Sequence, residues 1–301
     1  MKKKILILLS DPNSVNYEIV KKSLFFFKKK TKNDYIFIGC KNDFLKSQKL
    51  LDNNININFI DIKKNSSIKK YLLNCFNTSF FLLKNKQAHG IINLPLDKKY
   101  LPKKYPGFTE FIAAKFKKKN KETMLLYSDK ISVCPNTTHI PIKYVHKKLT
   151  QKIIQKNTLN IYNFYKKIIK IKKPTLKILG LNPHCGIDMH SMTEEKKIII
   201  PAIKKLKLKK INITGPISAD TAFNKIHKSK INCIIGNYHD QVLPAFKNIC
   251  EFDAINITLG LPFLRVSPDH GTAKDIVGRN IANPNSFLFA LNFFEKFFKN
   301  L

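Results

Sequence analysis

The amino-acid sequence predicts an α/β fold built around a largely parallel sheet. Short apolar runs alternate along the chain with longer, lysine-rich amphipathic stretches, which is the pattern of strands that alternate with helices. The chain has 301 residues and is 44% hydrophobic, so it can form a sizeable core in one or two domains. The same apolar content excludes a wholly disordered chain.

The elements follow from this alternation. Strands are predicted at 4–9, 35–40, 55–60, 90–94, 123–127, 130–134, 176–181, 231–236 and 254–259. Helices are predicted at 17–29, 68–85, 109–119, 150–171, 193–206 and 286–299. The last helix is apolar on nearly every side, so we expect it to be buried or to lie at a subunit contact.

The charge balance is strongly basic but does not indicate nucleic acid. The chain has 55 Lys and Arg against 20 Asp and Glu, a net charge of +35. Only Arg265 and Arg279 are arginine, although nucleic-acid readers favour arginine for its bidentate fork. Lysine is enriched together with Asn, Ile and Phe, whose codons are AT-rich, so mutational bias explains a solvated lysine coat. We expect no nucleic-acid partner, and a basic nucleic-acid-binding protein stays the distant alternative.

The location follows from the apolar runs and the cysteines. No run approaches the length of roughly 18 residues that a membrane span needs, so we expect no membrane partner. The apolar segment near the start covers only 5–9, shorter than the roughly 7–15 residues of a secretory signal. The six cysteines form no CxxC pair, which is typical of reduced thiols. We therefore expect a cytoplasmic protein.

Three histidines occupy the same kind of position. His139, His184 and His239 each follow an apolar strand where the chain leaves the sheet. Ligands of open α/β sheets bind at the carboxyl ends of strands, and three neutral imidazoles there would form an open divalent-metal site. Spacing alone leaves a second interpretation, in which they are hydrogen-bonded structural residues.

A glycine-containing loop follows near the C-terminus. The chain has no GxGxxG fingerprint, so a Rossmann dinucleotide site is unsupported. The run His270, Gly271, Thr272 and Ala273 can offer backbone N–H groups to an adenosine or a phosphate. Asp275 could accept hydrogen bonds from a ribose hydroxyl. An ordinary turn is the alternative interpretation.

Several unusual segments run in order along the second half of the chain. They include Gly180-Leu-Asn-Pro-His-Cys-Gly, Thr193-Glu-Glu, Gly215-Pro-Ile-Ser-Ala-Asp-Thr-Ala-Phe, Tyr238-His-Asp-Gln and Asp269-His-Gly-Thr-Ala. Together they resemble the 4-hydroxythreonine-4-phosphate dehydrogenase family of pyridoxal-phosphate biosynthesis. The resemblance implies an isocitrate/isopropylmalate-dehydrogenase-like two-domain α/β/α fold, not a Rossmann fold. The expected domains are 1–108 plus 257–301, with the dinucleotide loop, and 109–256, for metal, substrate and dimerisation.

The resemblance also implies an activity. It is the NAD(P)-dependent and metal-dependent oxidation of 4-phosphohydroxy-L-threonine to 2-amino-3-oxo-4-phosphooxybutanoate, which decarboxylates to 3-amino-2-oxopropyl phosphate. NAD is expected before NADP, and zinc before magnesium or cobalt.

The resemblance assigns roles to residues as well. It makes His139, His184 and His239 the metal ligands, shared between the subunits of a homodimer. The implied substrate-binding residues are Thr109, Lys247, Asn256 and Arg265. The implied cofactor-binding residues are His270, Gly271, Thr272, Ala273 and Asp275. Asp220 and Asp240 are candidates for proton transfer because they lie beside strand ends.

The chain departs from the family pattern at several positions. Phe108 stands where the family has a histidine that contacts substrate, and Ile187 replaces an acidic residue. The family's glycine-rich segment after the first strand is replaced by 10–16. The alternative functions are therefore a dehydrogenase of another phosphorylated four-carbon hydroxy acid, such as 4-phosphothreonate or 4-phosphoerythronate, or a weakened relative.

Overall fold

The structure is a computed structural model that describes residues 2–47, 57–64, 67–105, 107–190, 192–224 and 230–300. Ile55, in the strand predicted at 55–60, lies outside these residues. The chain packs into two compact units, one formed by Met1–Glu122 with Phe252–Lys299 and the other mainly by Thr123–Glu251. The functional domains expected from the sequence, 1–108 with 257–301 and 109–256, stay a prediction.

The first unit contains a sheet with the strand order β3-β2-β1-β4-β11-β10. All pairs are parallel except β10 with β11. The strands are β1 (Lys4–Leu8), β2 (Asp34–Gly39), β3 (Asn58–Asp61), β4 (Gly90–Asn93), β10 (Ile255–Leu259) and β11 (Leu264–Pro268). The helices of this unit are α1 (Asn16–Lys22), α2 (Lys41–Ser47), α3 (Ile68–Lys84), α4 (Phe108–Lys115) and α9 (Asn285–Phe297).

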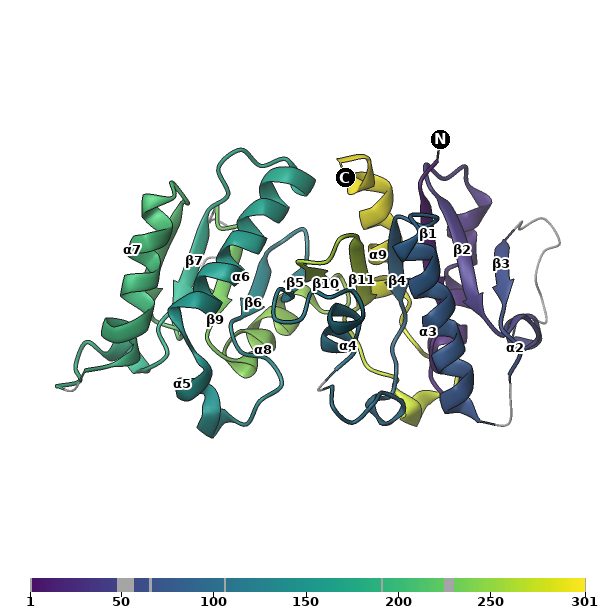
Figure 1. Cartoon of the computed structure of the whole chain (residues 1–301), viewed down its shortest axis with the longest axis horizontal. Coiled ribbons are helices and arrows are strands. Elements are labelled where there is room, and N and C mark those ends of the chain that lie inside the picture. The colour runs from purple at the N-terminus through teal and green to yellow at the C-terminus, as the bar shows by residue number, and fades with distance from the viewer. Residues whose placement is uncertain are drawn as a thin grey trace. The chain divides into compact units, whose positions relative to one another are not determined.

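Helices cover both faces of the first sheet. Ile91 of β4 belongs to the apolar cluster that contains α3 and α4, and α3 lies in front of β1 and β4 in Figure 1. Gly90 faces the other way, because a Cβ there would lie 2.7 Å from the ring of Phe294 in α9. Since side chains alternate along a strand, α9 covers the opposite face from α3.

The second unit repeats this plan with the strand order β5-β6-β9-β7-β8. β5 is antiparallel to β6, and the remaining pairs are parallel. The strands are β5 (Thr123–Tyr127), β6 (Ser132–Pro135), β7 (Leu176–Leu179), β8 (Ile213–Ile217) and β9 (Cys233–Gly236). The helices are α5 (Val145–Lys148), α6 (Gln151–Phe164), α7 (Ile200–Leu208) and α8 (His239–Cys250).

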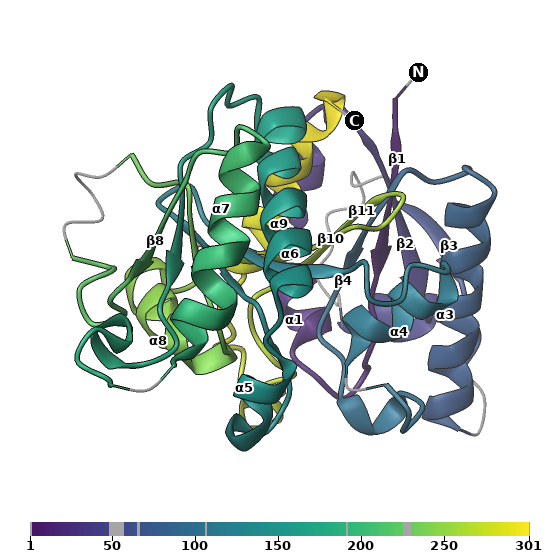
Figure 2. The same cartoon turned by 60° about the vertical axis from the view of Figure 1, so that its left-hand side comes forward.

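The second sheet is also covered on both faces. A Cβ on Gly236 of β9 would meet Val242 of α8 at 2.6 Å. Tyr165, in the π-helical turn that continues α6, hydrogen-bonds Ser132 of β6 with 2.6 Å between the two hydroxyls, and its environment includes Cys233. Cys233 and Gly236 face opposite sides of the sheet. The helices that they face, α6 and α8, therefore cover opposite faces. Figure 2 shows α6 and α7 side by side on one face.

The predicted α/β class and the mostly parallel sheet are confirmed, and five elements were missed, among them the one-turn helix α5. β8 contains Gly215 and Pro216, a pair that indicates a turn in sequence. β11 is short and interrupted by Arg265. α8 contains Pro244, and the short α2 had no clear apolar period. The expected burial of the last helix is confirmed.

Two further expectations can be compared with the described residues. Within them, no helix is long and apolar enough to cross a membrane. All six cysteines are free thiols, and five of them are buried.

Phe294 tests the packing of α9 against the first sheet. Its side chain is 0% exposed, so Phe294→Ala is expected to lower the free energy of unfolding by about 3–5 kcal/mol in urea denaturation, the usual cost of a buried Phe→Ala change. The matched control is Phe81→Ala on α3, because Phe81 is 60% exposed. Equal losses for the two variants would contradict this packing.

Candidate active site

The parallel strands of the second unit bring the three histidines to one edge of its sheet. His139 follows β6, His184 follows β7, and His239 follows β9 as the first residue of α8. β9 pairs in parallel with both β6 and β7, so their carboxyl ends lie at the same edge. The sequence placed each histidine after a strand, and the strand order makes these strands neighbours.

Two of the histidines are close together. The ring centroids of His139 and His239 lie 5.7 Å apart. The Nδ1 atom of His239 lies 2.5 Å from Oδ1 of Asp240, a contact that orients the imidazole and leaves Nε2 as its other ring nitrogen. Asp240 itself is exposed, with 77% of its side chain accessible.

His184 lies in a turn of unusual backbone conformation. His184, Cys185 and Gly186 have successive φ angles of 48°, 59° and 65°, in the left-handed region that non-glycine residues rarely adopt. A Cβ on Gly186 would also meet Thr193 at 2.8 Å, so glycine is required there. Such strained turns persist only where the surroundings hold them.

A buried carboxylate holds this turn. Oε1 of Glu195 accepts hydrogen bonds from the backbone N–H groups of Leu181 and Asn182, at 2.7 and 2.8 Å. Oε2 accepts one from Nδ2 of Asn182 at 2.9 Å. Burial raises the pKa of Glu195, but the hydrogen bonds from Asn182 outweigh it, so that the pKa lies below its usual value. Glu195 is therefore ionised and fixes the start of the His184 loop.

Asp220 lies after β8, beyond the end of the same sheet. A hydrogen bond from the side chain of Ser218 is the main cause that lowers its pKa, and the charge of His184 adds to it. Asp220 is thus a carboxylate near His184 in an exposed position.

The three histidines do not form a complete ligand set within one chain. Among the residues that the structure describes, no group of three or more His, Cys, Asp or Glu side chains is arranged to hold a metal ion. The structure brings His139 to His239 and leaves His184 outside that pair. Lys247 lies farther along α8, on its exposed side.

The first unit contains a buried arginine whose hydrogen-bond partners are neutral side chains. Arg265 of β11 is 3% exposed. Its Nε donates to Oδ1 of Asn93 at 2.6 Å and its Nη1 donates to Oγ1 of Thr258 at 2.8 Å. Its Cζ lies 5.4 Å from the ring centroid of Phe108. In the described parts of the chain, no carboxylate forms an ion pair with Arg265.

The charge of Arg265 persists despite burial. Burial lowers its pKa to about 10, and Glu110 acts in the opposite direction. Because this value is far above neutrality, the guanidinium stays protonated. A buried, protonated guanidinium with only neutral partners can bind an anion.

Two other predicted substrate residues lie beside Arg265. Oγ1 of Thr109, on α4, lies 3.4 Å from Nη1 of Arg265. Asn256 of β10 pairs with Ser267 of β11, and its buried Oδ1 has no hydrogen-bond donor among the described residues. The structure therefore gathers Thr109, Asn256 and Arg265 on neighbouring elements of one unit.

The predicted cofactor loop is joined to two other loops of the first unit. Its Thr272 carbonyl accepts from the N–H of Val15 at 3.2 Å, and Lys274 forms an ion pair with Asp97. Nδ1 of His270 lies 2.9 Å from the carbonyl oxygen of Gly271. These loops follow β1, β4 and β11, which are parallel neighbours.

The backbone of this loop is accessible at one point. A Cβ on Gly271 would meet no atom within 4 Å, so glycine leaves open space beside the main chain. Thr272 and Ala273 are partly buried, and Asp275 is exposed. The loop therefore has room for a ligand that approaches its backbone.

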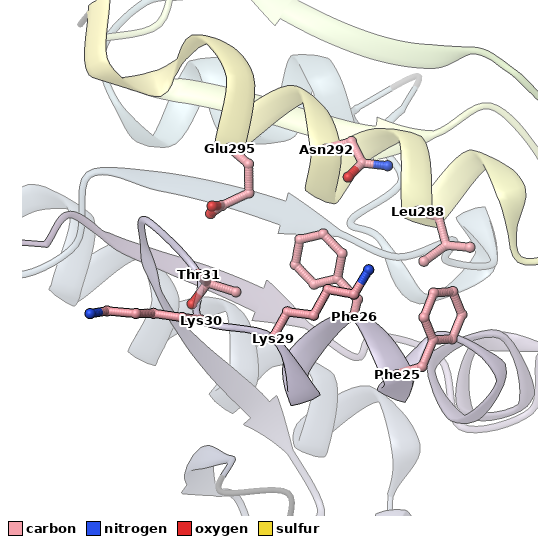
Figure 3. A pocket seen from close by; sticks show the side chains of 8 residues that line it. All are labelled: Phe25, Phe26, Lys29, Lys30, Thr31, Leu288, Asn292 and Glu295. Atoms are coloured by element: carbon pink, nitrogen blue, oxygen red, sulfur yellow. The ribbon is translucent and has the colours of Figure 1, made fainter.

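A pocket of the first unit lies apart from these residues. It has a cavity volume of about 350 Å³. Its lining residues are Phe25, Phe26, Lys29, Lys30, Thr31, Leu288, Asn292 and Glu295 (Figure 3). No predicted site residue lines it.

Sequence reasoning missed the residues that hold the site. Glu195 and Asn93 were not assigned roles, and neither were Asn237 and Gln241, which link strand ends. The signal for Glu195 was its place in the Thr193-Glu-Glu segment, and that for Gln241 was Tyr238-His-Asp-Gln. Asn93 begins the segment Asn93-Leu-Pro-Leu-Asp-Lys, which stands where the family has a Thr-containing motif, whereas nothing in the sequence marks Asn237 among the many asparagines.

Comparison with solved structures defines the class of protein. The β-decarboxylating dehydrogenase from Thermococcus kodakarensis aligns over 97% of this chain and 83% of its own length, with a TM-score of 0.51 and 11% identity. The likeness shows a fold shared with this dehydrogenase, which agrees with the predicted α/β class. The solved 4-hydroxythreonine-4-phosphate dehydrogenase from Klebsiella pneumoniae is more similar, with a TM-score of 0.78, 25% identity and coverage of 97% and 98%.

Comparison of sequences defines the family. The family model described as pyridoxal phosphate biosynthetic protein PdxA matches residues 8–294. The 4-hydroxythreonine-4-phosphate dehydrogenase of Sulfurihydrogenibium sp. is 37% identical over 96% of both chains. That of Aquifex aeolicus is 35% identical over 98% of both. The chain belongs to this family of oxidoreductases, which confirms the resemblance found in the sequence.

Glu195 provides a test of the His184 loop. Glu195→Met removes the acceptor of two backbone N–H groups, and hydrogen bonds to charged groups contribute roughly 1.5–3 kcal/mol. Amide hydrogen exchange at Leu181 and Asn182 is therefore expected to accelerate at least about tenfold. Glu194→Met is the matched control, because Glu194 accepts from the side chain of Asn182 and from no backbone N–H among the described residues. Unchanged exchange in Glu195→Met would contradict the anchoring role.

Proposed function

We propose that the chain oxidises the secondary alcohol of 4-phosphohydroxy-L-threonine with NAD(P) and a divalent metal ion. The product would be 2-amino-3-oxo-4-phosphooxybutanoate, which loses CO2 to give 3-amino-2-oxopropyl phosphate. Family membership supports the reaction, and the observation that carries the substrate class is the buried Arg265. A buried cation with no carboxylate partner in the described chain is suited to a substrate with phosphate and carboxylate groups.

In the first unit, this chain's own residues would bind and orient the substrate. The guanidinium of Arg265 is held in one orientation by Asn93 and Thr258, and the ring of Phe108 lies against it. Within the described residues, Nη2 has no hydrogen-bond acceptor, so it can donate to an anionic oxygen. Oγ1 of Thr109 can donate to the same anion, and the orphaned Oδ1 of Asn256 can accept from a ligand N–H or O–H.

In the second unit, His139, His184 and His239 would hold the metal ion. The 5.7 Å between the rings of His139 and His239 suits two ligands of one ion, since Zn–N bonds are about 2.0–2.1 Å. Imidazoles suit zinc or cobalt better than magnesium. When bound, the ion would polarise the alcohol oxygen of the substrate and favour loss of its proton.

Three further residues of the second unit would support the reaction at the metal site: Asp240, Asp220 and Lys247. Asp240 holds Nδ1 of His239, a contact that keeps Nε2 available as a donor atom. Asp220 is a carboxylate near His184 and would be a candidate for proton transfer by virtue of that position. The ammonium group of Lys247 would bind an anionic group of the substrate.

A homodimer would complete the metal site. The described residues of one chain do not bring three ligands together, and exposed apolar side chains follow two of the histidines. Ile142 is 71% exposed and Ile187 is 78% exposed. Apolar side chains that flank an incomplete site favour a second copy of the chain as their cover.

The loop at 270–275 would bind the nicotinamide nucleotide, which would accept the hydride. Gly271 leaves open space beside the backbone, and Asp275 is available to a ribose hydroxyl, which favours NAD over NADP. The six free thiols favour a cytoplasmic location.

A steady-state assay tests this proposal. With 4-phosphohydroxy-L-threonine, NAD and divalent metal, NADH is expected to form, and a chelator is expected to abolish it. His184→Ala should remove both activity and bound metal, whereas His146→Ala, an exposed histidine of the same unit, should keep both. Oxidation of 4-phosphoerythronate or 4-phosphothreonate instead would favour the alternative substrate. Full activity in metal-free protein would exclude the metal role.

The two arginines allow a matched test of the anion site. Arg265→Met is expected to lower kcat/KM by roughly 100-fold or more, the scale for loss of a buried charged partner. Arg279→Met, at an exposed position, should change kcat/KM less than twofold. Equal effects of the two substitutions would exclude Arg265 as the anion-binding residue.

A further inference from the structure

Asn237 lies between the three strand ends that carry the histidines. It directly follows β9 and is 0% exposed. Its Nδ2 donates to the carbonyl of Leu179, the last residue of β7, at 2.9 Å. Its Oδ1 accepts from Nδ2 of Asn136, which directly follows β6, at 3.3 Å. One buried amide thus connects β9 to both of its neighbours.

The backbone of Asn237 adds to these links. Its carbonyl accepts from the N–H of Thr137 at 3.2 Å and from Oγ1 of Thr137 at 2.7 Å. Its N–H donates to Oε1 of Gln241 at 2.7 Å. All four hydrogen-bonding groups of Asn237 therefore have partners within the chain.

Gln241 makes a second bridge between two of the strand ends. It lies on the first turn of α8, and its Nε2 donates to the carbonyl of Gly180 at 2.7 Å. Because its Oε1 accepts from Asn237, its side chain connects the end of β9 to the end of β7. Gln241 thus connects Gly180, at the start of the His184 loop, to Asn237, which lies two residues before His239.

These links begin where the regular strand ladder ends. The ladder between β6 and β9 stops at Pro135 and Gly236, and the one between β9 and β7 stops at Ile178 and Ile235. Beyond those pairs, backbone hydrogen bonds continue between β6 and β9, from the N–H of Asn136 to Gly236 and from that of Thr137 to Asn237. The side chains of Asn237 and Gln241 add hydrogen bonds to the end of β7, and that of Asn237 adds one to Asn136 after β6.

We propose that Asn237 and Gln241 are positioning residues that hold the strand ends from which the loops of His139, His184 and His239 begin, and that they thereby set the affinity of the protein for a divalent cation. The proposal rests on the proposed function, in that the histidines bind metal. Neither side chain needs to contact the ion, since each acts through the backbone that carries a ligand. Partners that orient metal ligands typically contribute 10–100-fold to affinity.

The test is titration of the full-length protein with Co²⁺, whose visible absorption reports ligand geometry. Gln241→Met keeps the length of the side chain and removes both hydrogen bonds. It is expected to raise the Kd for Co²⁺ by about 10–100-fold and to alter the spectrum. Asn237→Leu is expected to do the same. Urea denaturation of each variant reports folding, and Gln241→Met decides the result where Asn237→Leu does not fold.

The matched control is Asn232→Leu at the other end of the same strands. Oδ1 of Asn232 accepts from the N–H of Thr175 at 2.8 Å, so it links β9 to β7 at the edge away from the histidines. This variant should bind Co²⁺ within twofold of wild type and with the same spectrum. A loss equal to that of Gln241→Met would mean a structural role only and would overturn the proposal.

The remaining outcomes separate the two hypotheses. Wild-type binding that is lost in His239→Ala but kept in Gln241→Met overturns the positioning role and leaves the proposed metal site intact. Wild-type protein that binds no Co²⁺, or His239→Ala that binds it normally, overturns both.

Discussion

The parallel pairing of β6, β9 and β7 is the constraint on which the second unit's site depends. Parallel strands direct their carboxyl ends to one edge, so loops that are far apart in sequence begin side by side. β9 lies between the other two, and its first residue beyond the ladder, Asn237, bonds to both neighbours. The ends of these strands determine where the histidines lie. Without that pairing they would be three isolated surface residues.

In the first unit, by contrast, some buried polar groups can form hydrogen bonds or ion pairs for which the described residues provide no partner. Arg265 is buried with neutral partners, and Oδ1 of Asn256 is buried without a donor. Burial of such groups is costly unless they are paired. The fold retains them on adjacent strands, next to Thr109. This pattern is typical of a binding site whose ligand completes the hydrogen bonds.

The strong basic charge of the chain does not by itself identify either site. Most lysines are exposed, and exposed ion pairs contribute little. Several of the few carboxylates form specific hydrogen bonds. Glu195 holds the His184 turn, Asp240 orients His239, and Glu295 of α9 accepts from Asn33 and Tyr35. In a chain with few acidic residues, those that bond to buried backbone or to a histidine are informative.

The sequence by itself determined the fold class, the family and the placing of each histidine after a strand. It could do so because apolar periodicity and local motifs are properties of neighbouring residues. It missed β8, β11 and α8, in which Gly215-Pro216, Arg265 and Pro244 contradict local propensity and tertiary packing outweighs it. Only the tertiary structure decided that Arg265 hydrogen-bonds neutral side chains, that His139 lies close to His239, and that Asn237 joins three strand ends. Those are contacts between distant segments, and their partners are set by strand order.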